Sequence, residues 1–530
     1  MRRRTFLKGT AASVAAMAAA GSAPALAQPA GNRVLRMIPH ANLTSVDPIW
    51  TTAYISRNHA YMVWDTLYGT DERFEIKPQM AAGHEVSSDG KVYTITLRDG
   101  LKFHDGERVL AKDAVASLKR WMKRDSFGQF ADTLIDEMTA RDDKTLVIRL
   151  KQAFPALLQA IGKPSSNVPF IMPERVANTD PMQQISVDNC VGSGPFKFER
   201  GDYRPGASMA WSKFADYQPR NEPPSWSAGG KVAKVDRVEW RIIPDSATAA
   251  AALQAGEVDW WEQPAPDLLA VLRRNRAVKV EILDNLGNMA MMRFNHLHPP
   301  FNNPGVRRAV LAAANQADYL AAMMGGDQEL ARECYSVFTC GTPLASEVGA
   351  EEAKAHNLER AKQMLREAGY NGERTVIIAP TDIPISSAAS QVTNQLLRSL
   401  GMNVEYRATD WGTVVQTRAS REPGAWSLFH TWWVGADMAN PAVNPGLRGN
   451  GLNGWFGWAT EPRLEELRNQ WMVAPDAAAS TRIAQDIQRV AMQTAPFVTV
   501  GWFFLPAAYR ANLRGVLPGP VPWFWNIEKA

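Results

Sequence analysis

Aromatic residues gather in one stretch of the chain, between Trp426 and Trp458. Aromatic rings offer a large contact area and lose little conformational freedom on binding, which suits the wall of a ligand pocket. Glycine and proline are frequent in the same stretch, and this predicts a pocket wall built from loops rather than from a helix or a strand. The alternative is that the rings belong to the core, because tryptophan is buried on average. The ligand-binding candidates in this stretch are Trp432, Trp433, Trp455 and Phe456.

A second group of candidates follows the first expected strand, Arg33 to Ile38. Proteins with α/β folds often bind ligands in the loop after a strand. Asp47 and Tyr54 are therefore predicted to bind ligand, and Trp50 is a weaker candidate. Further along, Arg448 could meet a ligand carboxylate, although a surface position is the simpler expectation.

The residues that often perform catalysis do not form a recognisable set. His296 and His298 stand beside Pro299, and with no third metal ligand nearby we interpret them as part of a structural turn. The 192–194 segment, GSG, does not fit the G-x-S-x-G pattern of a nucleophile elbow. The sequence has no phosphate-binding loop, no GxGxxG motif and no paired catalytic residues. We therefore do not expect an enzyme, and we expect no catalytic residue, metal ion or cofactor.

Strand and helix patterns alternate along the chain. Apolar residues recur at every second position around Ile95 and Ile148, as in half-buried strands. Apolar residues recur at helical spacing after Asn357, Thr460 and Ser480, which we expect to be helix N-caps. Strands that alternate with helices predict an α/β fold.

The length and the cysteines limit the architecture. A chain of 530 residues exceeds what one hydrophobic core usually holds, so two or three domains are expected. Cys334 and Cys340 could close a small loop in an oxidising compartment, and two buried thiols are the alternative. Cys190 would then remain unpaired. Three cysteines and eight histidines do not form a zinc framework.

The first 27 residues have the three parts of an export signal. Arg2, Arg3, Arg4 and Lys8 make a basic start, an apolar run follows, and Ala25 to Ala27 offers a cleavage site. Arg3 and Arg4 before Phe6 also fit the twin-arginine pattern, which we prefer over an ordinary secretion signal. No cysteine follows the apolar run, so we expect no lipid anchor.

The export signal also explains the charge. The whole chain has 58 basic and 54 acidic residues, and the signal contains four of the basic ones and no acid. The remaining chain is therefore neutral, and nothing indicates electrostatic binding of nucleic acid or anionic lipid.

Five segments in order resemble the extracytoplasmic solute-binding proteins of family 5, the dipeptide, oligopeptide and nickel receptors of ABC importers. The 83–119 segment, with RDG, KFHDG and a following helix, resembles the family signature. VGSGPFKFE at 191–199 is similar to the family's "VGTGPF" segment, and the 235–261 segment is similar to its "IPD" turn and "ALQAGEVD" unit. The 293–310 and 357–370 segments resemble the family's strand crossing and its "eaGY" helix.

The resemblance implies a fold of two α/β lobes around a cleft, of the class II periplasmic-binding-protein type, with an extra subdomain inserted in lobe one. Carried over, lobe one comprises residues 31–72, 191–290 and 501–530. The inserted subdomain is 73–190, and lobe two is 291–500.

The resemblance also implies two ligand-binding residues. The WWVGAD segment resembles the family's "GW.gD", whose acid binds the α-amino group of peptides, and Asp437 is the matching position. A carboxylate in a dry cleft needs a cationic partner, and an ammonium group would supply a charge-assisted hydrogen bond. Asn295 matches the family's "fN" at the crossing between lobes. The chain departs from the family after Asp437, because the 438–441 segment, MANP, stands where many peptide-binding members have a second acidic unit.

The function implied is that of a periplasmic, monomeric receptor. It would capture a peptide or another amino-containing solute between the lobes and deliver it to the permease of an ABC importer. Opines, glutathione-like thiols and other amino compounds suit the same cleft. The alternatives are a secreted hydrolase, or a periplasmic chaperone or sensory receptor on the same fold.

Overall fold

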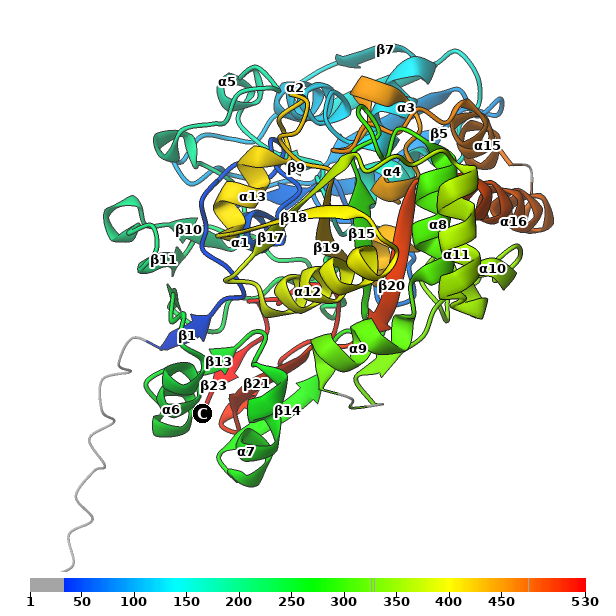
Figure 1. Cartoon of the computed structure of the whole chain (residues 1–530). Coiled ribbons are helices and arrows are strands. Elements are labelled where there is room, and N and C mark those ends of the chain that lie inside the picture. Colours follow the sequence, from blue (N-terminus) through cyan, green and yellow to red (C-terminus); the bar gives the residue numbers. More distant parts are fainter. Residues whose placement is uncertain (1–32, 326, 328, 475) are drawn as a thin grey trace, which may run out of the picture.

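The computed structural model describes residues 33–325, 327, 329–474 and 476–530 (Figure 1). The expected export signal, residues 1–27, lies outside the described residues. Helices and strands alternate along the described chain, and the strands form two large sheets. This confirms the predicted α/β class. In this part of the chain, no helix has both the length and the apolar character needed to cross a membrane.

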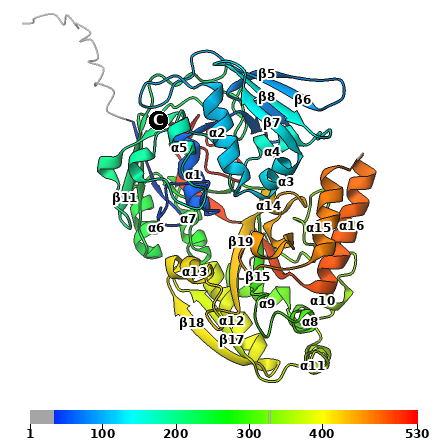
Figure 2. The ribbon, with the colours of Figure 1, turned by 90° about the horizontal axis from the view of Figure 1, so that it is seen from above.

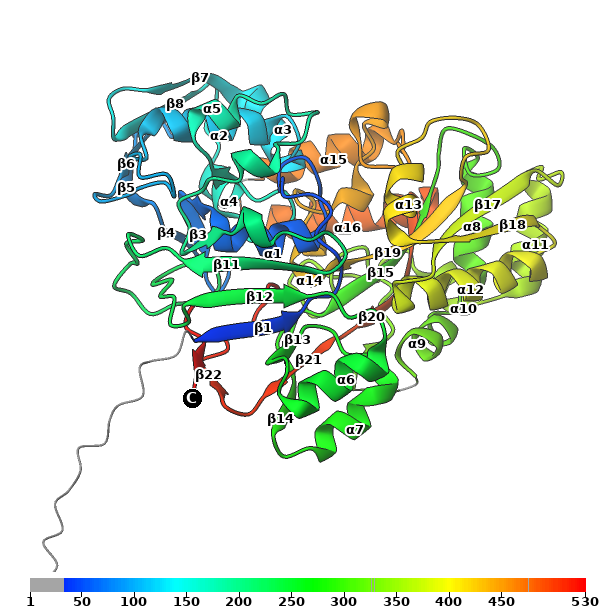
Figure 3. The ribbon, with the colours of Figure 1, turned by 90° about the vertical axis from the view of Figure 1, so that its left-hand side faces the viewer.

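The first large sheet has seven strands drawn from three separate stretches of the chain. Its central strand, β1 (Val34–Ile38), runs parallel to both of its neighbours, and Leu35 and Met37 are completely buried. Helices α6 (Ser246–Ala255) and α7 (Leu269–Arg274) pack beside this sheet (Figure 3). In spatial order the strands are β10 (Phe196–Phe198), β11 (Ser208–Lys213), β12 (Arg237–Arg241), β1, β13 (Trp260–Trp261), β21 (Pro506–Arg510) and β14 (Val278–Ile282).

The second large sheet has six strands, and its strand β15 (Asn288–Phe294) is buried along its whole length. Helices α12 (Pro384–Ser399) and α9 (Gln316–Met324) pack against this sheet (Figure 1). In spatial order the strands are β16 (Ala331–Arg332), β20 (Phe497–Phe503), β15, β19 (Leu428–Val434), β17 (Arg374–Pro380) and β18 (Asn403–Thr409). The helices of this half are α8 (Pro304–Ala313), α9 (Gln316–Met324), α10 (Glu351–Ala355), α11 (Leu358–Glu367), α12 (Pro384–Ser399), α13 (Trp411–Thr417), α14 (Gly435–Met438), α15 (Pro462–Met472) and α16 (Ala477–Thr494).

Two short connections join the two sheets. Residues 283–287 lead from β14 into β15, and residues 504–505 lead from β20 into β21 (Figure 3). Two neighbouring chain segments of this kind can act as a hinge, because a few backbone angles suffice to rotate one half against the other. The predicted two-lobed architecture is therefore present.

A third, four-stranded antiparallel sheet lies at the end of the molecule opposite β17 and β18 (Figure 2). Its strands fall within the 73–190 range for which an inserted subdomain is expected, while the boundaries themselves stay a prediction. Its strands and helices are β5 (Ala81–Val86), β6 (Val92–Leu97), β8 (Thr145–Leu150), β7 (Ile135–Ala140), α2 (Ala111–Met122), α3 (Ser126–Leu134), α4 (Leu157–Gly162) and α5 (Glu174–Ala177). Helix α1 (Tyr54–Val63) and three strand pairs complete the fold, namely β2 (Asp65–Thr66) with β9 (Phe170–Ile171), β3 (Tyr68–Thr70) with β4 (Ile76–Pro78), and β22 (Leu513–Arg514) with β23 (Glu528–Lys529).

The buried apolar residues divide the molecule into two main bodies. Ile95, Trp121 and Leu146 of the four-stranded unit belong to the same core as Leu35 and Trp240 of the first sheet. The second sheet has a separate core of its own. Because packed side chains move together, we expect the four-stranded unit to move with the first sheet.

One of the three expected N-cap residues caps a helix, and two do not. Asn357 caps α11 as predicted, since its side chain accepts a hydrogen bond from the Arg360 N–H at 2.9 Å. The prediction for Thr460 is wrong, because α15 starts after Glu461 with a proline, whose fixed φ favours the first helical position. The prediction for Ser480 is also wrong, because Asp476 caps α16 and Ser480 lies within the helix.

The aromatic stretch is not only loop. Residues 428–434, LFHTWWV, form β19 inside the second sheet, which corrects the expectation of a wall built from loops. Aromatic and β-branched residues favour a pleated, half-buried surface, and here this preference outweighs the nearby glycines and prolines. The turns and short helices begin only at Gly435.

Of the two states left open for the cysteines, the structure has the disulfide. Cys334 and Cys340 are bonded, with their Cα atoms 6.0 Å apart. Cys190 is a buried free thiol.

Candidate functional site

Asp437 lies at the boundary between the two halves of the molecule. It belongs to α14, directly after β19, and is 1% exposed. Its Oδ2 accepts hydrogen bonds from the Tyr54 hydroxyl at 2.8 Å and from the Ser165 hydroxyl at 2.9 Å. Tyr54 starts α1 and Ser165 follows α4, so both bonds come from the opposite half. The carboxylate therefore joins the second half of the protein to the first.

Tyr54 is itself held firmly. Its hydroxyl oxygen accepts a hydrogen bond from the Val434 N–H at 2.8 Å. The Arg57 guanidinium lies over its ring, 4.3 Å from the ring centroid. Arg57 also donates to the Ser165 hydroxyl and, at 3.0 Å, to the Pro520 carbonyl. The two hydroxyls that reach Asp437 are thus positioned by the same arginine.

The charge of Asp437 is only partly compensated. Burial raises the pKa of Asp437, and the charges of Lys163 and Arg57 and the two hydrogen bonds oppose that rise. Lys163 makes its ion pair with Asp125 instead. Within the described chain, Oδ1 of Asp437 accepts no hydrogen bond, and no cation forms an ion pair with either oxygen. A carboxylate in this state can accept a bond from an ammonium group.

A cavity of about 70 Å³ lies beside Tyr54, between the two sheets. Both hinge segments contribute to its wall, as do the loop after β1, helix α1, strands β13 and β19, and the loop near the C-terminus. The wall is partly aromatic and partly polar, which is the usual composition of a small-molecule site. Its lining residues include His40, Tyr54, Arg57, Trp260, Glu262, Gln263, Asp284, Asn288, Trp432, Leu505 and Pro520.

The polar groups of the cavity differ in charge state. Although burial alone would raise the pKa of Glu262, the neighbouring His40 and Arg57 hold it below the ordinary value. Glu262 accepts from His40 Nδ1 at 2.8 Å and from the Asn58 side chain at 2.9 Å. Burial raises the pKa of Asp284, in the first hinge segment, to about 7. The cavity therefore contains one carboxylate, Glu262, that accepts from a histidine and an asparagine side chain, and a second, Asp284, whose pKa lies near neutral pH.

A larger hollow, about 510 Å³, lies away from these residues, between the β3–β4 hairpin and residues 220–229. Its wall carries charges of both signs that already pair with one another. Arg220 contacts Glu222 at 2.8 Å, and Lys77 contacts Glu75 at 2.5 Å. Because these partners satisfy each other at the surface, we do not regard this hollow as the main site.

Trp432 and Trp433 point to opposite faces of β19, as neighbouring strand residues do. Trp432 lines the cavity, with its ring 5.4 Å from that of Tyr54 and 6.3 Å from that of His40. Trp433 packs against Trp455 on the other face, with ring centroids 5.2 Å apart. Its ring is also 6.1 Å from that of Tyr54. The structure thus brings Trp432, Trp433, Tyr54 and Trp455 together around the strand that leads to Asp437.

Trp455 and Phe456 surround the guanidinium of Arg418. The guanidinium carbon lies 6.0 Å from the Trp455 ring and 4.7 Å from the Phe456 ring. Neither aromatic residue lines the cavity beside Trp432. Their ligand-binding role stays a prediction.

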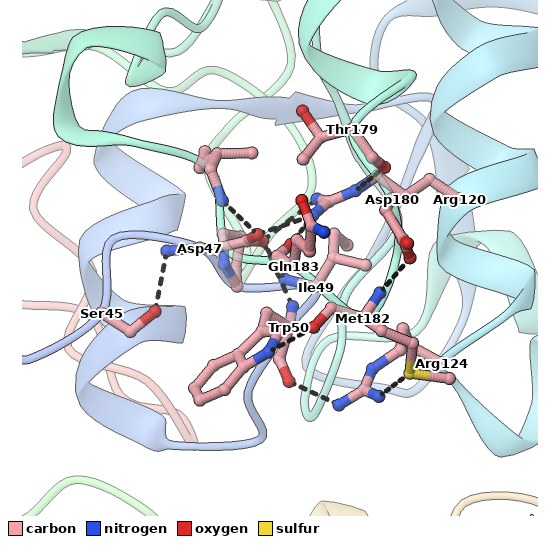
Figure 4. Close-up of polar contacts among 12 residues, drawn as sticks. Ser45, Asp47, Ile49, Trp50, Arg120, Arg124, Thr179, Asp180, Met182 and Gln183 are labelled. Atoms are coloured by element: carbon pink, nitrogen blue, oxygen red, sulfur yellow. Dashed lines mark hydrogen bonds and ion pairs between the residues drawn. The ribbon is translucent and has the colours of Figure 1, made fainter.

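Asp47 makes a different set of contacts (Figure 4). Its carboxylate forms a two-pronged ion pair with Arg120, at 2.7 and 3.1 Å, and is completely buried. It also accepts hydrogen bonds from the backbone of Ile49, Trp50 and Ile185. These contacts anchor the loop after β1 to α2, and Asp47 does not line the cavity. Its assignment as a ligand residue is an untested prediction.

Two further candidates are also engaged within the protein. The buried Asn295 donates to the Trp426 carbonyl at 3.1 Å and accepts from the Leu297 N–H at 3.1 Å, and its ligand-binding role stays a prediction. The expectation of a surface position for Arg448 is wrong. It is 7% exposed and donates to Gln129 of α3 at 2.7 Å, which links the second half to the four-stranded unit.

Sequence reasoning did not select Arg57, Lys163, Ser165, Glu262 or Asp284. Arg57 follows Tyr54 by three positions on α1, so helical spacing alone would have placed it on the same face. The others lie in loops or at strand ends far from Asp437 in sequence, and no local pattern indicates that the fold brings them together.

Comparison with known proteins gives consistent matches. The family described as "Bacterial extracellular solute-binding proteins, family 5 Middle" matches residues 75–453. A probable peptide ABC transporter periplasmic-binding protein, y4tO, of Sinorhizobium fredii is 37% identical over 100% of this chain and 99% of its own. The glutathione-binding protein GsiB of Escherichia coli is 26% identical, with 90% of each chain covered.

A solved structure shares the fold. The binding protein AgaA of A. tumefaciens R10, in complex with agropinic acid, superposes with a TM-score of 0.78 at 21% identity. The match covers 94% of this chain and 99% of AgaA.

Proposed function

Because this chain belongs to the bacterial extracellular solute-binding proteins, family 5, we propose that it is the substrate-binding receptor of an ABC importer. It captures a peptide or another amino-containing small solute between its two halves and delivers it to the membrane permease. It acts by binding and not by catalysis.

The observation that carries the choice of ligand is the incomplete hydrogen bonding of Asp437. Its Oδ2 is held by Tyr54 and Ser165, while its Oδ1 has no partner among the described residues. A buried carboxylate in this condition gains most from a positively charged donor. The ammonium group of an amino acid or peptide is such a donor, and Oδ1 is where it would bind.

Capture works by closure of the two halves. Asp437 comes from the second half and its partners from the first, so a solute bound at Asp437 touches both. Open and closed states of such proteins differ by a few kcal/mol, and contacts to both halves favour the closed state. A dissociation constant of about 1 μM corresponds to about −8 kcal/mol, which is enough to shift this balance.

The named relatives support the ligand class. One is called a peptide transporter component and the other a glutathione-binding protein, and both peptides and glutathione carry an α-ammonium group. The MANP segment after Asp437 departs from the acidic pattern of many peptide-binding members, so other amino compounds remain in the proposed class.

The proposed location is the periplasm. The first 27 residues have the features of a twin-arginine export signal, which would carry a folded protein across the membrane. We propose that the exported protein is a soluble monomer.

Two experiments test this function. Native mass spectrometry of the protein purified from the periplasm of its host should show the added mass of a bound amino-containing solute. This added mass should be lost after mild denaturation and refolding. A strain that lacks the gene should then lose uptake of that solute and regain it from a plasmid copy. Normal uptake in the deletion strain, together with hydrolysis of the solute by the pure protein, would contradict the proposal.

A further inference from the structure

Arg418 directly follows α13 and is 5% exposed. Four aromatic rings surround its guanidinium, and the distances from its carbon to the ring centroids are 5.4 Å for Trp411, 5.5 Å for Phe429, 6.0 Å for Trp455 and 4.7 Å for Phe456. Aromatic faces stabilise a cation without using its N–H groups. We call these five residues the Arg418 box.

The guanidinium of Arg418 has no hydrogen-bond acceptor among the described residues. Its Nε is buried without a hydrogen-bond partner, and no side-chain or carbonyl oxygen in the described chain accepts from either of its other nitrogens. Burial lowers the pKa of Arg418 to about 10, and no neighbouring carboxylate opposes that effect. A buried Nε–H group without an acceptor is a costly arrangement for a protein to keep.

The other buried arginines of the described chain differ in this respect. Each of them donates at least one hydrogen bond to an oxygen of the protein. For example, Arg293 donates to three backbone carbonyls, and Arg307 pairs with Glu461 at 2.9 Å. The full set is Arg57, Arg120, Arg293, Arg307, Arg448 and Arg468. Some of these arginines also have one buried nitrogen without a partner, but among the buried arginines of the described chain only Arg418 donates no side-chain hydrogen bond to the protein.

Two more buried donors near the box also lack an acceptor. The indole nitrogens of Trp455 and Trp433 have no partner among the described residues, and these two rings are in contact. Guanidinium and indole groups only donate hydrogen bonds. A negatively charged group that accepts hydrogen bonds would complete this cluster, and a carboxylate fits the planar fork of an arginine.

The box lies on a continuous path to Asp437. Trp455 contacts Trp433, and the Trp433 ring is 6.1 Å from that of Tyr54, whose hydroxyl binds Asp437. These steps limit the separation between the carboxylate and the guanidinium to roughly 20 Å, the length of about six residues of extended chain. Trp411 and Phe456 keep part of their surface exposed, so the box can be reached from solvent.

We propose that the Arg418 box binds the carboxylate of the solute whose ammonium group binds Asp437. This inference rests on the proposed function and narrows it. The solute is then an amino acid derivative or short peptide with a free carboxylate, and the box is separate from the cavity beside Trp432.

The test uses two synthetic peptide libraries of two to six residues, one with free C-termini and one with C-terminal amides. The protein, freed of bound solute by unfolding and refolding, is mixed with each library, and captured peptides are measured by mass spectrometry. We expect the wild type to capture free acids about 10-fold to 100-fold better than the matching amides, since a charge-assisted bond to arginine is lost in the amide.

Variants of Arg418 form the second part of the test, because they show whether this residue causes the preference for free acids. Arg418→Met keeps the length of the side chain and suits an aromatic surrounding, and we expect its preference for free acids to fall below about 3-fold. Arg418→Lys keeps the charge without the fork, and we expect an intermediate preference. The thermal midpoint of the solute-free Arg418→Met variant should equal or exceed that of the wild type.

Each outcome decides the matter. Equal capture of acids and amides by the wild type would overturn the Arg418 proposal and leave the receptor function intact, and this comparison needs no variant to fold. An unchanged preference in Arg418→Met with a lowered thermal midpoint would show a purely structural arginine. Capture of neither library would overturn the Arg418 proposal and would remove short peptides from the proposed ligand class.

Discussion

Two buried aspartates, Asp47 and Asp437, are held in opposite ways. Asp47 has a bidentate arginine and three backbone N–H groups, so both of its oxygens are satisfied. Asp437 accepts from two neutral hydroxyls at Oδ2 and from no described residue at Oδ1, and burial raises its pKa. Burial alone therefore does not distinguish a structural carboxylate from a binding one. The two kinds of carboxylate differ in whether both oxygens already have hydrogen-bond partners.

The largest expected effect comes from Asp47→Asn. This change leaves the Arg120 guanidinium buried without its counter-charge, so we expect the free energy of unfolding to fall by about 3–5 kcal/mol. Urea unfolding followed by fluorescence measures it. Asp105→Asn is a matched control, because its pair with Arg175 is exposed and should contribute about 0–1 kcal/mol. Solute affinity of the folded Asp47→Asn protein should be unchanged, and a large loss of affinity would return Asp47 to the binding site.

Asp437→Asn should have the reverse effects, a large loss of solute affinity and little loss of stability. We expect calorimetric affinity for the captured solute to weaken by about 2–5 kcal/mol, because a buried ammonium loses its charged partner. The unfolding free energy should change little at acidic pH. Since the pKa of Asp437 is raised in the folded state, the wild type loses stability as the pH rises through that pKa, and the variant should not. Unchanged affinity would remove Asp437 from the site.

Asp284, in the cavity wall, tests whether a buried carboxylate with a raised pKa lowers stability at neutral pH. Its pKa is raised to about 7 in the folded protein, so its favourable contribution is complete below about pH 4 and is lost as the pH rises from 4 to 7. Asp284→Asn should therefore stabilise the solute-free protein at pH 8, by about 2 kcal/mol after allowing for partial solvent contact, and change nothing at pH 4. Unfolding at both pH values measures this, with the exposed Asp136→Asn as a control that should show no difference. Equal effects at pH 4 and pH 8 would contradict the assigned titration.

The smallest expected effect is that of Ser165→Ala. One of the two hydrogen bonds to Asp437 is lost, and we expect affinity to fall by about 1 kcal/mol. Ser390→Ala is the control, because Ser390 is buried equally well but donates only to a carbonyl within its own helix. An equal loss in both variants would point to a general effect of the deleted hydroxyl.

The sequence indicates the fold better than it indicates the site. The alternation around Ile95 and the cap at Asn357 are local patterns, and the structure has both elements. The partners of Asp437 are 383 and 272 positions away along the chain, so no local pattern could pair them. Asp47 and Asn295 look polar and available in the sequence, but only tertiary packing shows that both are already satisfied. The reverse holds for Arg418, which looks ordinary in sequence and is left without an acceptor by the fold.

The two hinge segments, residues 283–287 and 504–505, also form part of the cavity wall. Asp284 of the first and Leu505 of the second both line the cavity between the sheets. Any rotation of one half against the other must therefore reshape the compartment at its pivot. A guest too bulky for the contracted compartment would wedge the pivot open, and a guest that fits would let it shut. With this geometry, the same closing movement would select solutes by size and would mark the receptor as loaded.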